Sequence, residues 1–257
     1  MPIAFVNGTH IAYHRIGQGV PIIFIPPPMV GTFVFYKQAI ELSKHFDVIM
    51  MELRGHARSD ASQEYLAYSI VADDICALMD DLNIYRAILV GYSMAGQIVL
   101  EFLLKYPHRA YGAVPVSTFP EASDLRLKAE LNTALQLVKR RGMRTLAFAL
   151  ALANADTGRA LRNMYRTGTA SNRDNVTDLF REALTYQCTQ QLGDIELPVR
   201  LIFGAKDIRL LHYREMFSQC LPNATKVIIP GVSHQVPTKA AETLNTEIRE
   251  FVTHLST

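Results

Sequence analysis

The sequence predicts an α/β fold, in which a mainly parallel, twisted sheet carries helices on both faces and also receives an inserted all-helical cap. Three observations support this prediction. Short apolar runs alternate with helix-spaced segments through the first 120 residues, two more apolar runs follow residue 190, and the stretch between them has helical periodicity without a convincing strand. We therefore expect a core formed by residues 1–120 and 190–257, with the cap at 121–189.

The predicted strands are short apolar runs bounded by turn residues. Residues 3–6 and 11–14 flank Asn7-Gly8, a pair that tolerates positive φ and favours a hairpin. The run at 21–25 ends where three prolines begin, because proline has no N–H to donate to a strand ladder. Consecutive apolar residues are typical of strands buried on both faces of a parallel sheet. Further runs of this kind lie at 47–51, 87–90, 199–203 and 226–229.

Segments with helical spacing separate these strands. The segment 69–82 carries an apolar face, and its acidic pairs Asp73-Asp74 and Asp80-Asp81 lie off that face, so we expect them to be solvated. Two other core helices are expected at 36–44 and 97–106. The helix-like segments of the expected cap are 125–139, 143–153, 158–167 and 176–186.

Composition excludes several classes of protein. The chain has 257 residues, of which 49% are hydrophobic and 19% charged, which excludes a disordered or collagen-like chain. The net charge of +2 and the lack of a long basic block give no support to nucleic-acid binding. Cys76, Cys188 and Cys220 are odd in number and widely spaced, which suits free thiols. With no signal peptide or membrane-length apolar run, we expect a cytoplasmic protein, whose oligomeric state the sequence leaves open.

The strongest chemical signal is Gly91-Tyr92-Ser93-Met94-Ala95-Gly96, which lies between a predicted strand and a predicted helix. Glycines two residues before and three residues after a serine allow a sharp turn that projects its hydroxyl at the carboxyl end of the strand. The following helix directs free N–H groups toward the same point. Ser93 is thus a candidate nucleophile, and the alternative is a tight turn with a structural role.

A nucleophilic serine requires a base and an orienting carboxylate. Asp207 and His234 each follow a predicted strand closely, and parallel strands bring their carboxyl ends to one edge of a sheet. We therefore expect both side chains to converge on Ser93. His212 remains an alternative base and Glu121 an alternative acid.

This pattern resembles the α/β-hydrolase fold superfamily over residues 3–118 and 190–255. The chain order of nucleophile, acid and histidine is the order of that family, and Leu53-Arg54-Gly55-His56-Ala57-Arg58-Ser59 is similar to its R-G-x-G-x-S loop, with Ala57 in place of a glycine. The resemblance implies that Ser93 is the nucleophile, His234 the general base and acid, and Asp207 the carboxylate that orients it. Serine at position 93 argues against dehalogenases and epoxide hydrolases, whose nucleophile is a carboxylate.

The loop after residue 25 departs from the family pattern. Family members usually have His-Gly-x there, where x donates an oxyanion N–H, and this chain has Pro26-Pro27-Pro28-Met29. If Pro27-Pro28 occupy the His-Gly places, the backbone N–H groups of Met29 and Met94 form the oxyanion hole. A frame shifted by one would put Pro28, which has no N–H, at the donor position. We favour Met29 with Met94.

The sequence is less informative about the substrate. No arginine lies beside Ser93 in the sequence, so we expect an uncharged, mostly apolar substrate. No strand–GxGxxG–helix unit and no metal-ligand motif is present, so we expect no cofactor and no metal. Apolar residues near the elbow, the proline loop and the cap are candidates for the pocket lining: Val30, Phe33, Phe119, Leu146, Phe148 and Val236.

These features together predict a cofactor-free serine hydrolase, carboxylesterase-like or lactonase-like, that cleaves a small ester or lactone through an acyl-enzyme intermediate. The expected partner is a small-molecule substrate, without nucleic acid or membrane. Fold does not fix chemistry, so the same triad could instead serve C–C bond hydrolysis, acyl transfer or perhydrolysis. A ligand sensor with slow turnover is the remaining alternative.

Overall fold

Eight strands form one sheet in the computed structural model, which describes residues 1–255. Their order is β1-β2-β4-β3-β5-β6-β7-β8. The pairs β1–β2 and β2–β4 are antiparallel, and all the other neighbouring pairs are parallel, which confirms the predicted fold class. The strands are β1 Ile3–Val6, β2 Thr9–Ile16, β3 Pro21–Ile25, β4 Asp47–Met51, β5 Ala87–Tyr92, β6 Ala110–Val116, β7 Val199–Gly204 and β8 Ala224–Ile229.

Seven of the eight strands lie at the predicted apolar runs. Val6 pairs with Thr9 across the expected hairpin, and Asn7 and Gly8 in its turn both have positive φ. Strand β6 was not among the predicted strands. Its first half includes the exposed Tyr111 and the small, buried Gly112, which weaken the apolar pattern.

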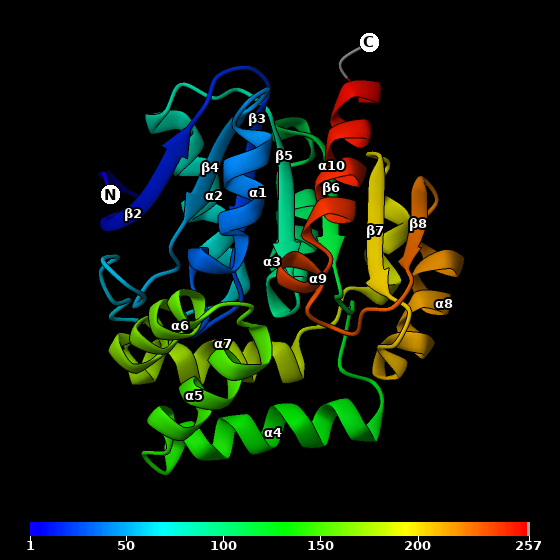
Figure 1. Cartoon of the computed structure of the whole chain (residues 1–257). Coiled ribbons are helices and arrows are strands. Elements are labelled where there is room, and N and C mark those ends of the chain that lie inside the picture. The colour runs from blue at the N-terminus through cyan, green and yellow to red at the C-terminus, as the bar shows by residue number, and fades with distance from the viewer. Residues whose placement is uncertain (256–257) are drawn as a thin grey trace.

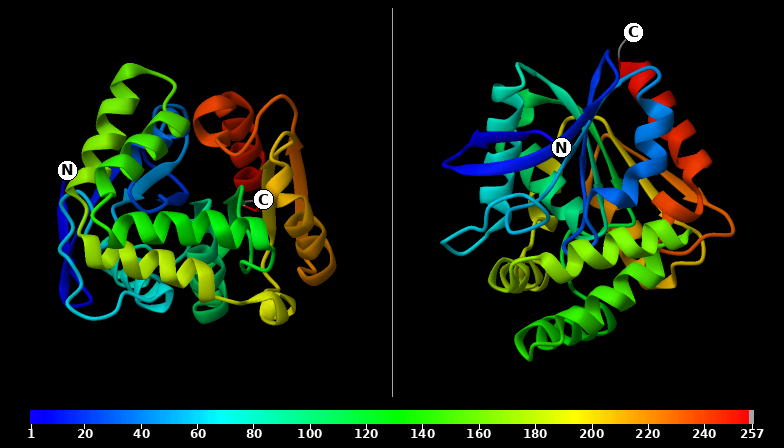
Figure 2. Two further views of the ribbon diagram at one scale, coloured as in Figure 1. Left: turned by 90° about the horizontal axis from the view of Figure 1, so that it is seen from below. Right: turned by 60° about the vertical axis from the view of Figure 1, so that its left-hand side comes forward.

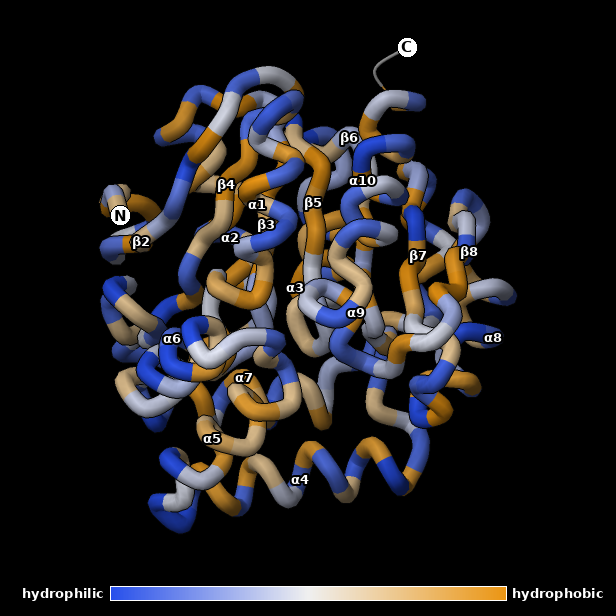
Figure 3. Tube along the Cα trace, in the orientation of Figure 1, coloured by the Kyte–Doolittle hydropathy of each residue, from blue (hydrophilic) through white to orange (hydrophobic). Residues whose placement is uncertain are grey.

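Helices cover both faces of the sheet (Figures 1 and 2). Helices α1 and α10 lie on one face, and α2, α3 and α8 lie on the other. Alternate residues of the central strands serve the two faces: Ile22 and Ile88 are buried under the first pair of helices, and Ile23 and Leu89 under the second group. Figure 3 shows the resulting apolar colouring along most of β5. These helices are α1 Tyr36–Leu42, α2 Tyr68–Asp81, α3 Met94–Lys105, α8 Leu211–Cys220 and α10 Ala241–Leu255, with the short α9 Val236–Lys239 before the last.

Four helices between β6 and β7 form the cap, below the carboxyl edge of the sheet in Figure 1. Helix α4 is amphipathic and buries Leu127, Leu131 and Leu135. Helix α7 begins three residues before its apolar pattern does, because the Asn172 side chain accepts hydrogen bonds from the N–H groups of Asp174 and Asn175 and so caps it. The cap helices are α4 Leu125–Lys139, α5 Met143–Asn154, α6 Gly158–Ala170 and α7 Arg173–Thr185.

One expectation about α2 is wrong. Asp74, expected to be solvated, is fully buried and forms an ion pair with Arg54 Nε at 2.6 Å. Asn7 also donates a hydrogen bond to it. The loop after β4 and the turn between β1 and β2 both fold over α2 at this point, and a helix-face pattern contains no information about such distant neighbours.

None of the helices formed by residues 1–255 combines the length and the apolar character that a membrane crossing requires. The three cysteines are free thiols, of which Cys188 is buried.

Candidate active site

Ser93 occupies a strained turn between β5 and α3. Its backbone has φ 57° and ψ −125°, a conformation that costs a non-glycine residue on the order of 1–3 kcal/mol. Hydrogen bonds on both sides hold it there. The Ser93 N–H donates to the Val116 carbonyl at 2.9 Å, and the Ser93 carbonyl accepts from Thr118 Oγ1 at 2.8 Å and from the Gly96 N–H at 2.9 Å.

The two glycines of this turn allow α3 to lie close against the sheet. A Cβ at Gly91 would overlap the Ala95 carbonyl oxygen, and one at Gly96 would overlap the Thr118 side chain. Close packing therefore requires glycine at both places. Gly96 lies against Thr118, the same residue whose hydroxyl donates to the Ser93 carbonyl.

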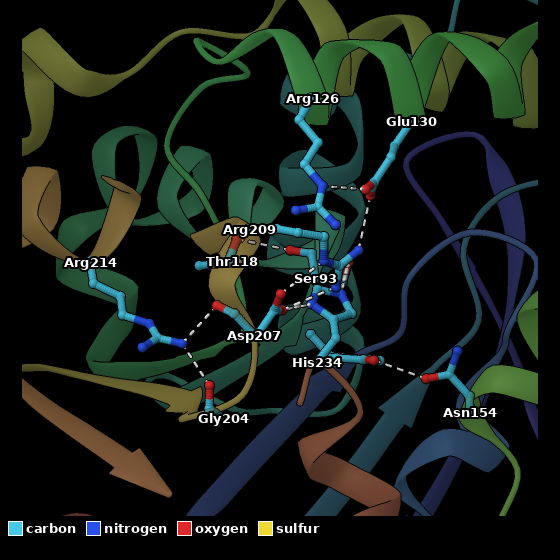
Figure 4. A network of polar contacts seen from close by, with 11 residues as sticks. Ser93, Thr118, Arg126, Glu130, Asn154, Gly204, Asp207, Arg209, Arg214 and His234 are labelled. Carbon is cyan, nitrogen blue, oxygen red and sulfur yellow. Dashed lines mark hydrogen bonds and ion pairs between the residues drawn. The ribbon is translucent and has the colours of Figure 1, made fainter. Parts of the chain in front are cut away.

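The expected convergence of the three polar side chains is present in the structure (Figure 4). His234 Nε2 lies 2.9 Å from Ser93 Oγ, and His234 Nδ1 lies 2.7 Å from Asp207 Oδ2. Asp207 follows β7 and His234 follows β8, so both come from carboxyl ends of neighbouring strands. The Asp207 side chain is 1% exposed and that of His234 16% exposed.

Electrostatics fixes the direction of these hydrogen bonds. Burial alone would raise the pKa of Asp207, but hydrogen bonds from His234 and Arg209 outweigh it and hold that pKa well below its usual range. Asp207 is therefore an acceptor, and His234 Nδ1–H donates to it. Nε2 of the neutral imidazole is then free to accept the Ser93 hydroxyl proton.

The alternative base and acid contact other groups. The His212 ring lies edge-on against Tyr213, and the Glu121 carboxylate accepts a hydrogen bond from Thr189 at 2.7 Å. His56 is buried in the loop after β4, and burial lowers its pKa to about 4. None of these side chains is hydrogen-bonded to Ser93 within residues 1–255.

A cavity of about 240 Å³ lies between the carboxyl edge of the sheet and the cap, with Ser93 and His234 in its wall. Its lining is mostly apolar. The residues that line it are Pro27, Pro28, Val30, Tyr92, Ser93, Met94, Phe119, Leu127, Glu130, Leu131, Ala134, Leu150, Ala153, Asn154, Phe180, Arg209, Leu210, His234 and Gln235.

Val30 and Phe119 are thus at the cavity, but the other candidate lining residues are not. Phe33 lines a separate surface groove and stacks on Tyr36. Val236, the first residue of α9, is fully buried in the core.

Two expected contacts from α5 are also corrected. Leu146 is buried, one turn before the cavity-lining Leu150, and Phe148 is 51% exposed on the outer side of the same helix. Only the face of α5 near its carboxyl end reaches the cavity, and an apolar run without gaps does not indicate which face that is.

Sequence reasoning missed several polar residues at the cavity. Arg209, two residues after Asp207, bonds that carboxylate and also Glu130 of α4. Tyr92 packs its ring 5.3 Å from that of His234 and donates its hydroxyl to Asn154 Oδ1 at 2.9 Å. Arg209 stands two residues after the candidate acid in the sequence, so the strand-end argument that places Asp207 at the site could also have placed Arg209 there.

The proline loop borders the cavity through Pro27, Pro28 and Val30. Met29 has φ 66° and is 1% exposed, with its side chain in the core. In the described chain, residues 1–255, neither the Met29 N–H nor the Met94 N–H donates a hydrogen bond to another protein group. Both N–H groups are therefore free of protein acceptors in that part of the chain and can donate to a ligand.

Glu52 supports the same loop from behind. Its carboxyl is buried and accepts hydrogen bonds from the Thr32 N–H at 3.3 Å and the Thr32 hydroxyl at 2.8 Å. Its second oxygen, Oε2, has no partner within residues 1–255. Burial raises the pKa of Glu52 to about 7, and the hydrogen bonds from Thr32 oppose that rise without cancelling it.

We predict that Gly96→Ala destabilises the protein by about 1–3 kcal/mol, because the new methyl group overlaps Thr118. Gly158→Ala is the matched control: it lies in open space at the start of α6, where alanine favours a helix by up to about 1 kcal/mol. Urea unfolding measures both. Equal stability of the two variants would contradict the packing account.

Glu52→Gln tests the buried carboxyl through the pH dependence of stability. A carboxyl whose pKa is raised to about 7 in the folded state stabilises the fold fully below about pH 4.5, and this contribution is lost as pH rises through 7. Glutamine keeps the acceptor for Thr32 and does not ionise. The unfolding free energy of the variant relative to the wild type should therefore rise by about 2–3 kcal/mol between pH 5 and pH 8.

The exposed Glu64→Gln provides the control, with no such trend expected. A Glu52→Gln difference that is constant with pH would show that the carboxyl stays ionised in the fold.

Comparisons with known proteins agree with this architecture. The family model described as alpha/beta hydrolase fold matches residues 21–237. A bifunctional esterase/perhydrolase of Acinetobacter calcoaceticus is 26% identical over 269 residues, covering 96% of this chain and 97% of that protein. An AB hydrolase superfamily protein of Bacillus subtilis (strain 168) is 37% identical over 92 residues, a match that covers 35% of this chain and 34% of that protein.

Among solved structures, the enol-lactonase from Burkholderia xenovorans LB400 has a similar fold. It superposes with a TM-score of 0.86 at 22% identity, and the match covers 98% of this chain and 100% of that protein. Because the family model spans most of the sequence, from the first parallel strand to the loop that carries His234, this chain belongs to the α/β-hydrolase family.

Proposed function

We propose that this hydrolase is a cofactor-free serine hydrolase that cleaves a small, mostly apolar carboxylic ester or lactone. One observation carries the proposal: the continuous hydrogen-bond chain from Asp207 through His234 to Ser93 opens onto an apolar cavity. A serine hydroxyl becomes nucleophilic when a base accepts its proton, and this chain supplies the base and the group that orients it.

The proposed reaction has two stages. Ser93 Oγ attacks the ester carbonyl while His234 Nε2 takes the hydroxyl proton, and Asp207 stabilises the imidazolium that forms. His234 then returns the proton to the leaving alcohol as the C–O bond breaks, which leaves an acyl group on Ser93. A water molecule activated by His234 attacks this acyl-enzyme and releases the acid and free Ser93.

The oxyanion of each tetrahedral intermediate needs N–H donors, and we assign this role to the amides of Met94 and Met29. Met94 begins α3, where the helix dipole also favours negative charge. Both amides lack a protein partner within residues 1–255, in agreement with this role. The loss of one oxyanion donor costs about 3 kcal/mol of transition-state stabilisation. The rate therefore depends strongly on whether Met29, which has an N–H, or Pro28, which has none, occupies the donor position.

The cavity favours an uncharged substrate, for a reason different from the one the sequence indicated. An arginine does lie at the site, but Arg209 pairs with Glu130 at 2.9 Å, and both line the cavity. Their charges are opposite in sign and compensate each other, and the other walls are mostly apolar. One relative is named a bifunctional esterase/perhydrolase and one structural neighbour an enol-lactonase, and both names agree with an ester or lactone as the proposed substrate. We propose a small-molecule partner and a cytoplasmic location.

A ligand sensor with slow turnover is the second candidate. Pro28 also borders the cavity and has no N–H to donate, so an oxyanion hole centred on it would have a single donor. Such a site would bind an ester and release product slowly.

We predict that the wild type hydrolyses p-nitrophenyl acetate or butyrate and that Ser93→Ala reduces kcat/KM at least about a thousandfold, because the nucleophile is lost. Ser43→Ala, at the exposed end of α1, should match the wild type. Steady-state kinetics at pH 7.5 over esters of increasing chain length measures the effect.

A folded Ser93→Ala variant that retains wild-type turnover would refute the serine mechanism. Negligible turnover by the wild type, together with a rise in its Tm on ester binding, would favour the sensor.

A further inference from the structure

A single guanidinium joins the candidate acid of the core to the cap (Figure 4). Arg209 Nε donates to Asp207 Oδ1 at 2.8 Å and Nη2 donates to Asp207 Oδ2 at 3.1 Å, so the carboxylate is held in two places. The remaining nitrogen, Nη1, donates to Glu130 Oε2 of α4 at 2.9 Å. Arg209 therefore connects the cap helix to the residue that orients His234.

The same oxygen of Asp207 serves both partners. Oδ2 accepts from His234 Nδ1 at 2.7 Å and from Arg209 Nη2 at 3.1 Å. The Asp207 side chain is 1% exposed and that of Arg209 26% exposed, so water screens this contact weakly. Arg209 thus fixes the plane of the carboxylate, and its positive charge also opposes the positive charge that His234 acquires on accepting the Ser93 proton.

Glu130 offsets that opposing charge. It lies on the far side of Arg209 from Asp207, and its side chain is 41% exposed, so its influence is weaker than that of Arg209. Arg126 Nε lies 3.4 Å from Glu130 Oε1 and is 60% exposed, which makes it a weak partner in water. The charge that His234 experiences is therefore set by three groups in sequence, Asp207, Arg209 and Glu130.

Other titratable or charged groups face this cluster from neighbouring elements. From α8, Arg214 Nη2 donates to the backbone carbonyls of Gly204 at 2.6 Å and Asp207 at 2.9 Å, which fixes the loop and leaves the Asp207 carboxylate to Arg209 and His234. From β5, Tyr92 packs against the His234 ring, and burial keeps its hydroxyl un-ionised by raising its pKa.

We propose that Arg209 and Glu130 form a positioning pair through which the cap helix α4 sets how readily His234 accepts the Ser93 proton. This inference rests on the serine-hydrolase function proposed above. Arg209 holds Asp207 in the orientation that His234 needs, and Glu130 limits the cost of placing a cation beside the future imidazolium. The cap then contributes a charge to catalysis as well as a wall to the cavity.

Charge and geometry can be separated by four variants. Arg209→Gln removes the cation, Arg209→Lys keeps the charge without the two-pronged contact, and Glu130→Gln keeps the shape of the cap side chain without its charge. Glu215→Gln is the matched control, since that exposed carboxylate on α8 pairs with Lys226 on the protein surface.

The readout is the acid limb of kcat/KM against pH, in parallel with an NMR titration of the His234 imidazole. We expect Arg209→Gln to move both midpoints to higher pH by roughly half a unit or more, and Glu130→Gln to move them to lower pH by roughly a few tenths. Arg209→Lys should keep the midpoint of the wild type with a lower kcat and little change in KM. Glu215→Gln should leave both unchanged.

Shifts of Arg209→Gln and Glu130→Gln in the same direction, or no shift in either folded variant, would overturn the inference. If Arg209→Gln does not fold, the sign of the Glu130→Gln shift decides alone. The NMR titration does not depend on turnover. A wild type without esterase activity but with opposite NMR shifts would refute the proposed function and leave only the electrostatic link from Glu130 through Arg209 to His234. Normal turnover without opposite shifts would refute this inference and leave the proposed function intact.

Discussion

The backbone of Ser93 lies in the left-handed region, at φ 57°, because β5 must pass directly into α3 at that residue, and the other groups of the site are placed relative to this turn. Hydrogen bonds to Val116 and Thr118 from the neighbouring β6 segment offset the strain. The turn exposes the Ser93 hydroxyl at the carboxyl edge of the sheet, where the loops after β7 and β8 bring Asp207 and His234. A parallel sheet makes this convergence possible, since all these strands end on one edge.

The parts of the structure that depend on local chemistry could be predicted from the sequence. Apolar runs locate strands because both faces of a parallel sheet are buried, and the helix at 125–139 was predicted with the same bounds as α4 because its leucines recur at helical spacing. Ser93, Asp207 and His234 could be singled out because each follows a strand closely. Their convergence required the strands to run parallel to one another, and the alternation of strands and helices in the sequence already indicates this.

The parts that depend on contacts between distant segments could not be predicted. Asp74 is buried because Arg54 and Asn7 reach it from other loops, and no pattern within α2 reveals this. Phe148 was expected at the cavity, but the rotation of α5 against its neighbours turns it to solvent. The link from Arg209 to Glu130 spans core and cap, and it depends on how α4 lies across the carboxyl edge. Helical periodicity gives the apolar face of α4 without giving its position over the sheet.

Covalent labelling shows directly whether the hydrogen-bond chain activates Ser93. The folded wild type would be treated with a fluorophosphonate at neutral pH, and intact-mass and peptide mass spectrometry would count and locate the adducts, with Ser93→Ala in parallel. We expect a single adduct on Ser93 of the wild type and none on the variant. No adduct on the folded wild type, or an adduct on another residue that persists in Ser93→Ala, would contradict it.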